Sequence, residues 1–143
     1  MSSKNKAVSA TRRRTLIGLA GLAASASAAE PFTIKRASLL QRKPEISHEE
    51  FVRHWVEIHA PMAHGIPGIG RYTLTIIKNT SARKGMPSYD IQVDGIAEQW
   101  FRSQADYEAY LNSPLTKRLR DDGATFIGRQ IDFLAEEKVI IST

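Results

Sequence analysis

The stretch LLQRKPEISHEEFVRHWVEIHAPM, residues 39–62, decides the fold of this chain. Its first residues complete a predicted strand over 33–42, which ends at Lys43-Pro44 because proline cannot donate to a strand ladder. Ser47 and Glu50 then have the spacing of a capping box, in which two side chains satisfy backbone N–H groups of the first helical turn. The stretch therefore predicts a strand followed at once by a helix.

The predicted helix carries one apolar stripe, which indicates the face that packs on a core. The stripe recurs at the i, i+4, i+7 and i+11 spacing of a helix face and consists of Phe51, Trp55, Ile58 and Met62. Pro61 and the glycines of the segment 65–68 are expected to end the helix.

Beyond residue 62, the same signals predict three more strands and two more helices. The strands are expected over 69–79, 91–101 and 131–141, with a loop over 80–90. Ser103 caps a second helix, which Pro114 breaks, and a short helix over 115–122 is expected to stop at Gly123.

The predicted order is β-α-β-β-α-β, which is typical of an α+β, ferredoxin-like fold. We expect a four-stranded antiparallel sheet with helices on one face. Apolar residues lie on both faces of the strands, so the bare face requires a partner. The sequence therefore predicts a homodimer whose two sheets close into a dimeric α/β barrel.

Length and composition exclude several classes of protein. The 143 residues suffice for one domain and a short appendage, and the absence of cysteine excludes disulfides, thiolate metal sites and cysteine nucleophiles. The net charge of +5 comes from residues 1–28, which hold five basic and no acidic residues. The remaining chain is neutral, so we expect no nucleic-acid partner and no anionic membrane surface.

Residues 1–28 have the pattern of an export signal. Arg12, Arg13 and Arg14 precede a short apolar run over 16–24, and Ala26-Ser27-Ala28 forms a cleavage site. We expect a signal of the twin-arginine type, handled by that export machinery, with a mature domain over 29–143 in the periplasm or outside the cell. The alternatives are the general secretory route and a retained anchor. The apolar run is too short to span a bilayer, so no stable membrane span is expected after cleavage.

The four histidines are the densest group of titratable residues, and His59 is the strongest candidate for chemistry. His54 and His59 lie about 140° apart around a helix and cannot share a metal, so no metal site is expected. A position near the helix end would raise the pKa of His59 and suit it to general acid or base catalysis. The alternative is that His59 only caps the helix. His64 enters the same loop and is a weaker candidate.

Four other candidates lie on the predicted sheet and one on the first helix. Glu98 lies between Ile96 and Trp100 and is either a helper in proton transfer or a partner in a structural salt bridge. The candidate ligand-binding residues, which could equally serve core or dimer packing, are Trp55, Arg71, Tyr72 and Trp100.

Four segments together resemble the EthD domain family, a branch of the dimeric α/β-barrel superfamily. They are LLQRKPEISHEEF (39–51), WVEIHAPM (55–62), IPGIGRYT (66–73) and DGIAEQWF (94–101). The resemblance implies a ferredoxin-like protomer, a homodimer and a ligand cleft between sheet and helices. It also implies oxidoreductase chemistry on small aromatic or polyketide-type metabolites.

Three functions remain open at this point. The first is an exported small-molecule enzyme that needs no cofactor and performs oxidative or proton-transfer chemistry on an apolar, aromatic or carbonyl-bearing metabolite. The second is a non-catalytic periplasmic dimer that binds a ligand. The third is a haem-binding member of the superfamily, with His59 or His64 as the axial ligand.

Overall fold

A computed structural model describes residues 31–141. The predicted export signal lies outside these residues, so export and the periplasmic location stay predictions. The elements, in chain order, are β1 (Ile34–Arg42), α1 (His48–His54), the π-turn η1 (Trp55–His59), the 3₁₀ turn η2 (Ala60–Ala63), β2 (Arg71–Ile76), β3 (Gly95–Phe101), α2 (Gln104–Asn112), α3 (Pro114–Phe126) and β4 (Ile127–Ala135).

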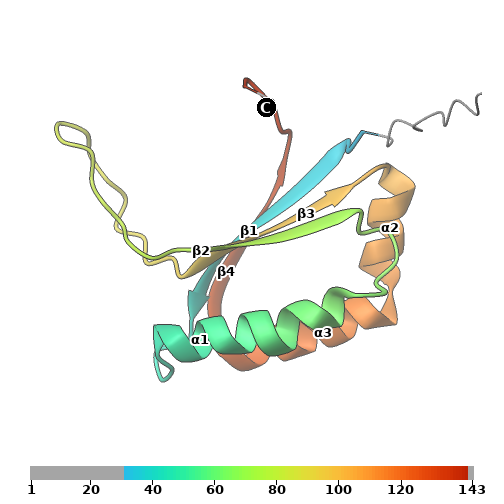
Figure 1. The fold of residues 1–143 in the computed structure, drawn as a ribbon, viewed down its shortest axis with the longest axis horizontal. Coiled ribbons are helices and arrows are strands. Elements are labelled where there is room, and N and C mark those ends of the chain that lie inside the picture. The colour runs from blue at the N-terminus through green and yellow to red at the C-terminus, as the bar shows by residue number, and fades with distance from the viewer. Residues whose placement is uncertain (1–30, 142–143) are drawn as a thin grey trace, which may run out of the picture.

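The four strands form one antiparallel sheet in the order β2-β3-β1-β4. The helices α1, α2 and α3 all lie on one side of this sheet, and the other side is bare (Figure 1). The predicted α+β, ferredoxin-like architecture is therefore confirmed.

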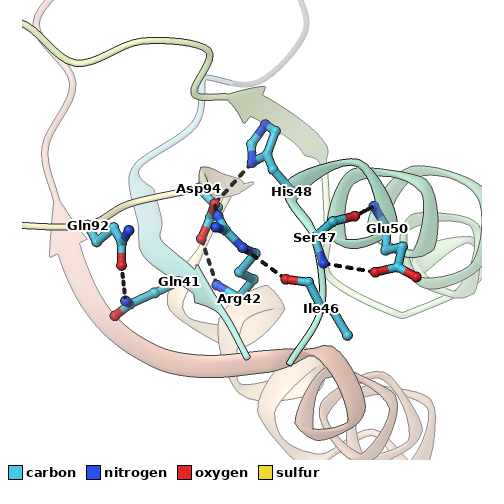
Figure 2. Close-up of polar contacts among 8 residues, drawn as sticks. All are labelled: Gln41, Arg42, Ile46, Ser47, His48, Glu50, Gln92 and Asp94. Atoms are coloured by element: carbon cyan, nitrogen blue, oxygen red, sulfur yellow. Dashed lines mark hydrogen bonds and ion pairs between the residues drawn. The ribbon is translucent and has the colours of Figure 1, made fainter. Parts of the chain in front are cut away.

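The predicted capping box is present at the start of α1. The Glu50 backbone N–H donates to the Ser47 hydroxyl at 3.1 Å, and the Ser47 backbone N–H donates to the Glu50 carboxylate at 2.8 Å (Figure 2). Two N–H groups that the helix itself cannot satisfy thus gain acceptors.

Beside this cap, Asp94 joins three segments that are distant in sequence (Figure 2). The Asp94 carboxylate is 3% exposed and accepts hydrogen bonds from the Arg42 backbone N–H at 2.8 Å, from the Arg42 guanidinium and from His48 Nδ1 at 3.0 Å. Burial favours a raised pKa for Asp94, but the bonds from Arg42 and His48 outweigh it and leave the pKa below its ordinary value. The end of β1, the start of α1 and the approach to β3 are therefore joined.

The core lies between the sheet and the helices in two clusters. One contains Leu40, Phe51, Trp55 and Phe126, and the other contains Ile66, Phe101, Tyr110 and Leu119. Gly95 makes room for the first cluster, because a Cβ at this position would lie 2.2 Å from the Trp55 ring. The Trp55 ring can consequently approach the backbone of β3 closely, and it is fully buried.

The π-turn η1 changes which residues of the first helical segment face inward. The predicted stripe is wrong at Ile58, which is 52% exposed, whereas His59 is only 7% exposed. A π-turn closes on the fifth residue rather than the fourth, so the chain turns more slowly and the next inward position after Trp55 falls on His59.

Several predicted boundaries are wrong where tertiary pairing overrides local pattern. Gly123 does not stop α3, which continues to Phe126, and β4 consequently begins at residue 127 rather than 131. The strands β2 and β3 are shorter than predicted because residues 77–94 leave the sheet as a long excursion (Figure 1).

Candidate functional site

A cavity of about 280 Å³ lies between the helix-covered face of the sheet and the segments η1 and α3. This is the position that the family resemblance implied for a ligand cleft. Its walls include apolar side chains from the core clusters and a smaller set of polar ones. The polar set comprises Arg36, Ser38, His59, Tyr72, Gln99, Arg120 and Gln130.

His59 enters the cavity from η1 and is held by a carboxylate from α3. His59 Nδ1 lies 2.7 Å from Asp122 Oδ2. A carboxylate partner assigns the proton to Nδ1, which leaves Nε2 as the basic nitrogen. Nε2 has no hydrogen-bond partner among residues 31–141, so it is free to act on a molecule in the cavity.

Burial lowers the pKa of His59, although Asp122 opposes this shift through its hydrogen bond and its charge. The predicted rise in the pKa is therefore wrong. The chain continues from His59 directly into η2, so the imidazole lies inside a helical segment rather than at a free C-terminal end. A lowered pKa keeps His59 neutral near pH 7, which is the form that a general base needs.

Two hydrogen-bond donors also line the cavity. Burial raises the pKa of Tyr72 to about 12, so its hydroxyl keeps its proton at neutral pH. The Trp55 indole N–H is buried and makes no hydrogen bond within the described residues, although it lies close enough to the Tyr72 hydroxyl to lower that pKa slightly. These donors are suited to an oxygen that gains negative charge.

Two arginine side chains, Arg36 and Arg120, lie on the cavity side of the sheet. The guanidinium of Arg36 already has protein partners, because it pairs with Asp132 at 2.8 Å and donates to Gln99 at 3.0 Å. Arg120 is exposed and makes no ion pair within residues 31–141. Arg129 lies opposite Gln41 and two positions before Ile131 on β4, so alternation along the strand directs its side chain to the bare face. The charge of the Arg120 guanidinium remains available to an anionic group on a ligand.

The structure places six of the seven predicted site residues in two groups. His59, Trp55 and Tyr72 line the cavity. Glu98, Trp100 and Arg71 lie together on the bare face of the sheet, because β2 pairs Arg71 with Trp100 and side chains alternate along β3.

On that bare face the predicted site residues are held by neighbouring charges. Lys35 Nζ lies 2.7 Å from Glu98 Oε1. Glu98 is therefore a partner in a salt bridge, which was one of its two predicted roles. The Trp100 ring lies under the Lys35 ammonium at 4.7 Å and the Arg71 guanidinium at 4.6 Å. Within one chain, Glu98 is not brought next to His59.

His64 is exposed at the end of η2 and does not line the cavity. The structure thus brings one of the four histidines to the cavity wall. His48 and His54 are half-buried beside carboxylates, Asp94 and Asp122 respectively.

Sequence reasoning missed Asp122, the partner of His59. A signal for it existed on α3, where Leu115, Leu119 and Phe126 form an inward stripe at helical spacing. Asp122 occupies the same stripe between Leu119 and Phe126, and a carboxylate on the inner face of a helix requires a partner.

Within residues 31–141, no group of three or more acidic or histidine side chains is placed to hold a metal ion. Over the same range, none of the helices combines the length and the apolar character needed to cross a bilayer.

The family model described as the EthD domain matches residues 43–130. The chain belongs to the EthD domain family. The matched range contains the capping box, His59, Tyr72 and Asp122. This EthD-domain protein is also 32% identical over 102 residues to the 4-carboxymethyl-4-methylbutenolide mutase of Pseudomonas reinekei, a match that covers 71% of this chain and 94% of the mutase.

Solved structures resemble this EthD-domain protein in fold. An ethyl tert-butyl ether d (ethd) family protein from Bacillus halodurans has a TM-score of 0.57 at 22% identity, covering 73% of this chain and 98% of that one. A cofactor-independent oxygenase from Streptomyces nogalater, solved as a mutant, has a TM-score of 0.51 at 13% identity, covering 77% and 97%.

Proposed function

We propose that this EthD-domain protein is an enzyme that moves a proton within a small unsaturated carbonyl compound, with His59 as the general base. The observation that carries the proposal is the His59–Asp122 pair at 2.7 Å, which, within the described residues, leaves Nε2 as the unpaired nitrogen of an imidazole in the cavity wall. A base in this arrangement is oriented by its carboxylate and needs no cofactor to take a proton.

The chemistry follows from the positions of the donors. His59 Nε2 takes a proton from a carbon beside the carbonyl, and the electron pair of the broken C–H bond moves to the carbonyl oxygen. The Tyr72 hydroxyl and the Trp55 N–H stabilise the resulting enolate oxygen, while Asp122 stabilises the imidazolium. The imidazolium then returns the proton at another carbon, so the reaction involves no net oxidation.

The substrate class is supported by the cavity and by the Pseudomonas reinekei relative. That enzyme is named for a butenolide, an unsaturated lactone, that carries a carboxymethyl group. In this chain Arg120 supplies the charge that a carboxylate requires. A cavity of about 280 Å³ lies at the lower end of the range for ligand sites, which favours a compact molecule.

Cofactor-independent oxidation is the second candidate, and the same base supports it. An enolate formed by His59 is electron-rich and could react with molecular oxygen as the oxidant, which would be consumed in proportion to substrate. Oxygen uptake during turnover therefore distinguishes the oxidoreductase from the proton-transfer enzyme.

The decisive experiment compares His59→Asn with His64→Asn on the 4-carboxymethyl-4-methylbutenolide named for the relative and on related lactones. Loss of a general base costs about 10²- to 10⁴-fold in rate, so we expect this loss for His59→Asn and near-unchanged turnover for His64→Asn. Circular dichroism verifies that both variants are folded.

Turnover by His59→Asn at the rate of the unmodified protein would overturn the proposal. Tight binding of the lactone without turnover, unchanged in His59→Asn, would instead support a ligand-binding protein. A Soret band after haem addition, lost in His59→Asn, would support the haem-binding alternative.

A further inference from the structure

The carboxylate that orients His59 has a second histidine partner. His54 Nε2 lies 3.1 Å from Asp122 Oδ1 and 3.2 Å from Asp122 Oδ2. His59 Nδ1 lies 2.7 Å from the same Oδ2 atom. His54 lies on α1, His59 on η1 and Asp122 on α3, so three elements meet at one carboxylate.

We propose that His54 is a positioning residue that locks Asp122 toward His59. The inference rests on the proposed function, because it assigns to His54 the support of the base named there. Asp122 is attached to α3 by a short side chain that could rotate toward solvent, since that side chain is 17% exposed. The His54 N–H contacts both carboxylate oxygens and thereby holds the carboxylate where Oδ2 reaches His59.

The position of His54 fits this role better than one of packing alone. Its ring centroid lies 4.4 Å from that of Phe126, which also contacts His59 at 5.2 Å. Phe126 thus sets the position of both imidazoles, but stacking does not require a nitrogen directed at Asp122. Phenylalanine in place of His54 would keep the stacking and remove the hydrogen bond.

The charged groups around His54 are few. From α3 it faces Asp122, and from η1 it faces His59. On its own helix, Glu50 lies one turn away and is engaged with the Ser47 cap. The neighbouring Asp121 is directed to Lys117 at 2.6 Å on the exposed side of α3. A change at His54 can therefore reach His59 by two routes, through Asp122 and through the direct charge interaction between the two imidazoles, and only the first route sets the tautomer of His59.

The chain supplies a matched control in His48. It is also half-buried and also pairs with a carboxylate, Asp94, at 3.0 Å, but that pair lies outside the cavity wall. His54→Phe and His48→Phe are the test pair, and His54→Gln is the conservative variant because its amide retains an N–H donor.

The first measurement is ¹⁵N NMR of the His59 ring without ligand, over a pH series. In the unmodified protein we expect the proton fixed on Nδ1. In His54→Phe we expect a mixture of tautomers and a shifted titration of His59. His48→Phe should match the unmodified protein, and His54→Gln should restore most of the signal.

The second measurement is steady-state kinetics with the butenolide. For His54→Phe we expect kcat to fall about tenfold or more, as for loss of a hydrogen bond to a charged group, with KM nearly unchanged. An unchanged His59 tautomer and titration in folded His54→Phe would overturn the inference, and so would failure of His54→Gln to restore the signal. If the NMR changes appear but His59→Asn has full activity, the positioning role stands and the proposed function fails.

Discussion

The burial of His59 decides how this residue responds to pH. Burial lowers its pKa below the ordinary value of 6.5, and Asp122 offsets only part of that effect. The imidazole is consequently a neutral base over a wider pH range than an exposed histidine. The same shift couples the protonation of His59 to the stability of the fold.

If His59 is the base, kcat/KM should fall on the acid side along a limb centred below pH 6.5. The limb follows the protonation of His59 in the free enzyme, so it should be absent from the residual activity of His59→Asn. A pH–rate profile of both proteins measures this. A limb centred above pH 7 would contradict the lowered pKa.

Stability should depend on pH with a definite sign. The unfolded chain binds a proton at His59 near pH 6.5, whereas the folded chain binds it only at lower pH. Below pH 6.5 the unfolded state therefore binds more protons, and stability falls as the pH falls. Urea unfolding at pH 7.5 and 5.5 should show a smaller loss for His59→Gln than for the unmodified protein, and equal losses would contradict the assignment.

At the scale of elements, two local structures position the site. The π-turn η1 brings His59 to the wall of the cavity and exposes Ile58. The Asp94 junction ties the strand β1 to the start of α1, the helix that leads into η1. The π-turn η1 orients His59, and the Asp94 junction stabilises the segment that carries it.

Asp94→Asn should destabilise the fold without changing the chemistry. The amide is neutral and has one acceptor oxygen in place of two, so it cannot keep both the Arg42 and the His48 contacts, and breaking a buried ion pair costs about 3 kcal/mol. Urea unfolding measures the loss, and the exposed Asp90→Asn is the control. A variant with unchanged stability, or with kcat reduced as strongly as in His59→Asn, would contradict this separation of roles.

At the scale of the whole molecule, the bare face of the sheet is the outstanding feature (Figure 1). Ile131 and Phe133 lie on it, at 55% and 43% exposure, beside the partly buried Leu39. Apolar side chains of this size on an open sheet are typical of a surface that meets another protein. We infer that a second copy of the chain covers this face, as the sequence predicted.

Light scattering of a chain that begins at residue 29 should therefore give the mass of a dimer at micromolar concentration. Ile131→Asp and Phe133→Asp should shift it toward the monomer, because each buries an unpaired charge in the contact. Ile58→Asp is the control, since Ile58 is 52% exposed but lies on the helical side. A monomeric unmodified protein would contradict the dimer.

The sequence by itself determined the order of the elements, the start of α1 and α2 and the family, and it made His59 the first candidate for chemistry. These features depend on local rules. A capping box, a proline after a strand and a run of alternating side chains act over a few residues, so their consequences can be deduced without knowing the rest of the fold.

Only the tertiary structure decided which residues share the site. His59 and Asp122 are 63 positions apart, and their contact depends on how α3 lies against η1. The separation of Glu98 from His59 has the same origin, because alternation along β3 identifies two faces but does not say which one the helices cover. Packing of distant segments makes that choice, since each helix buries its apolar stripe where the whole sheet offers a complementary surface.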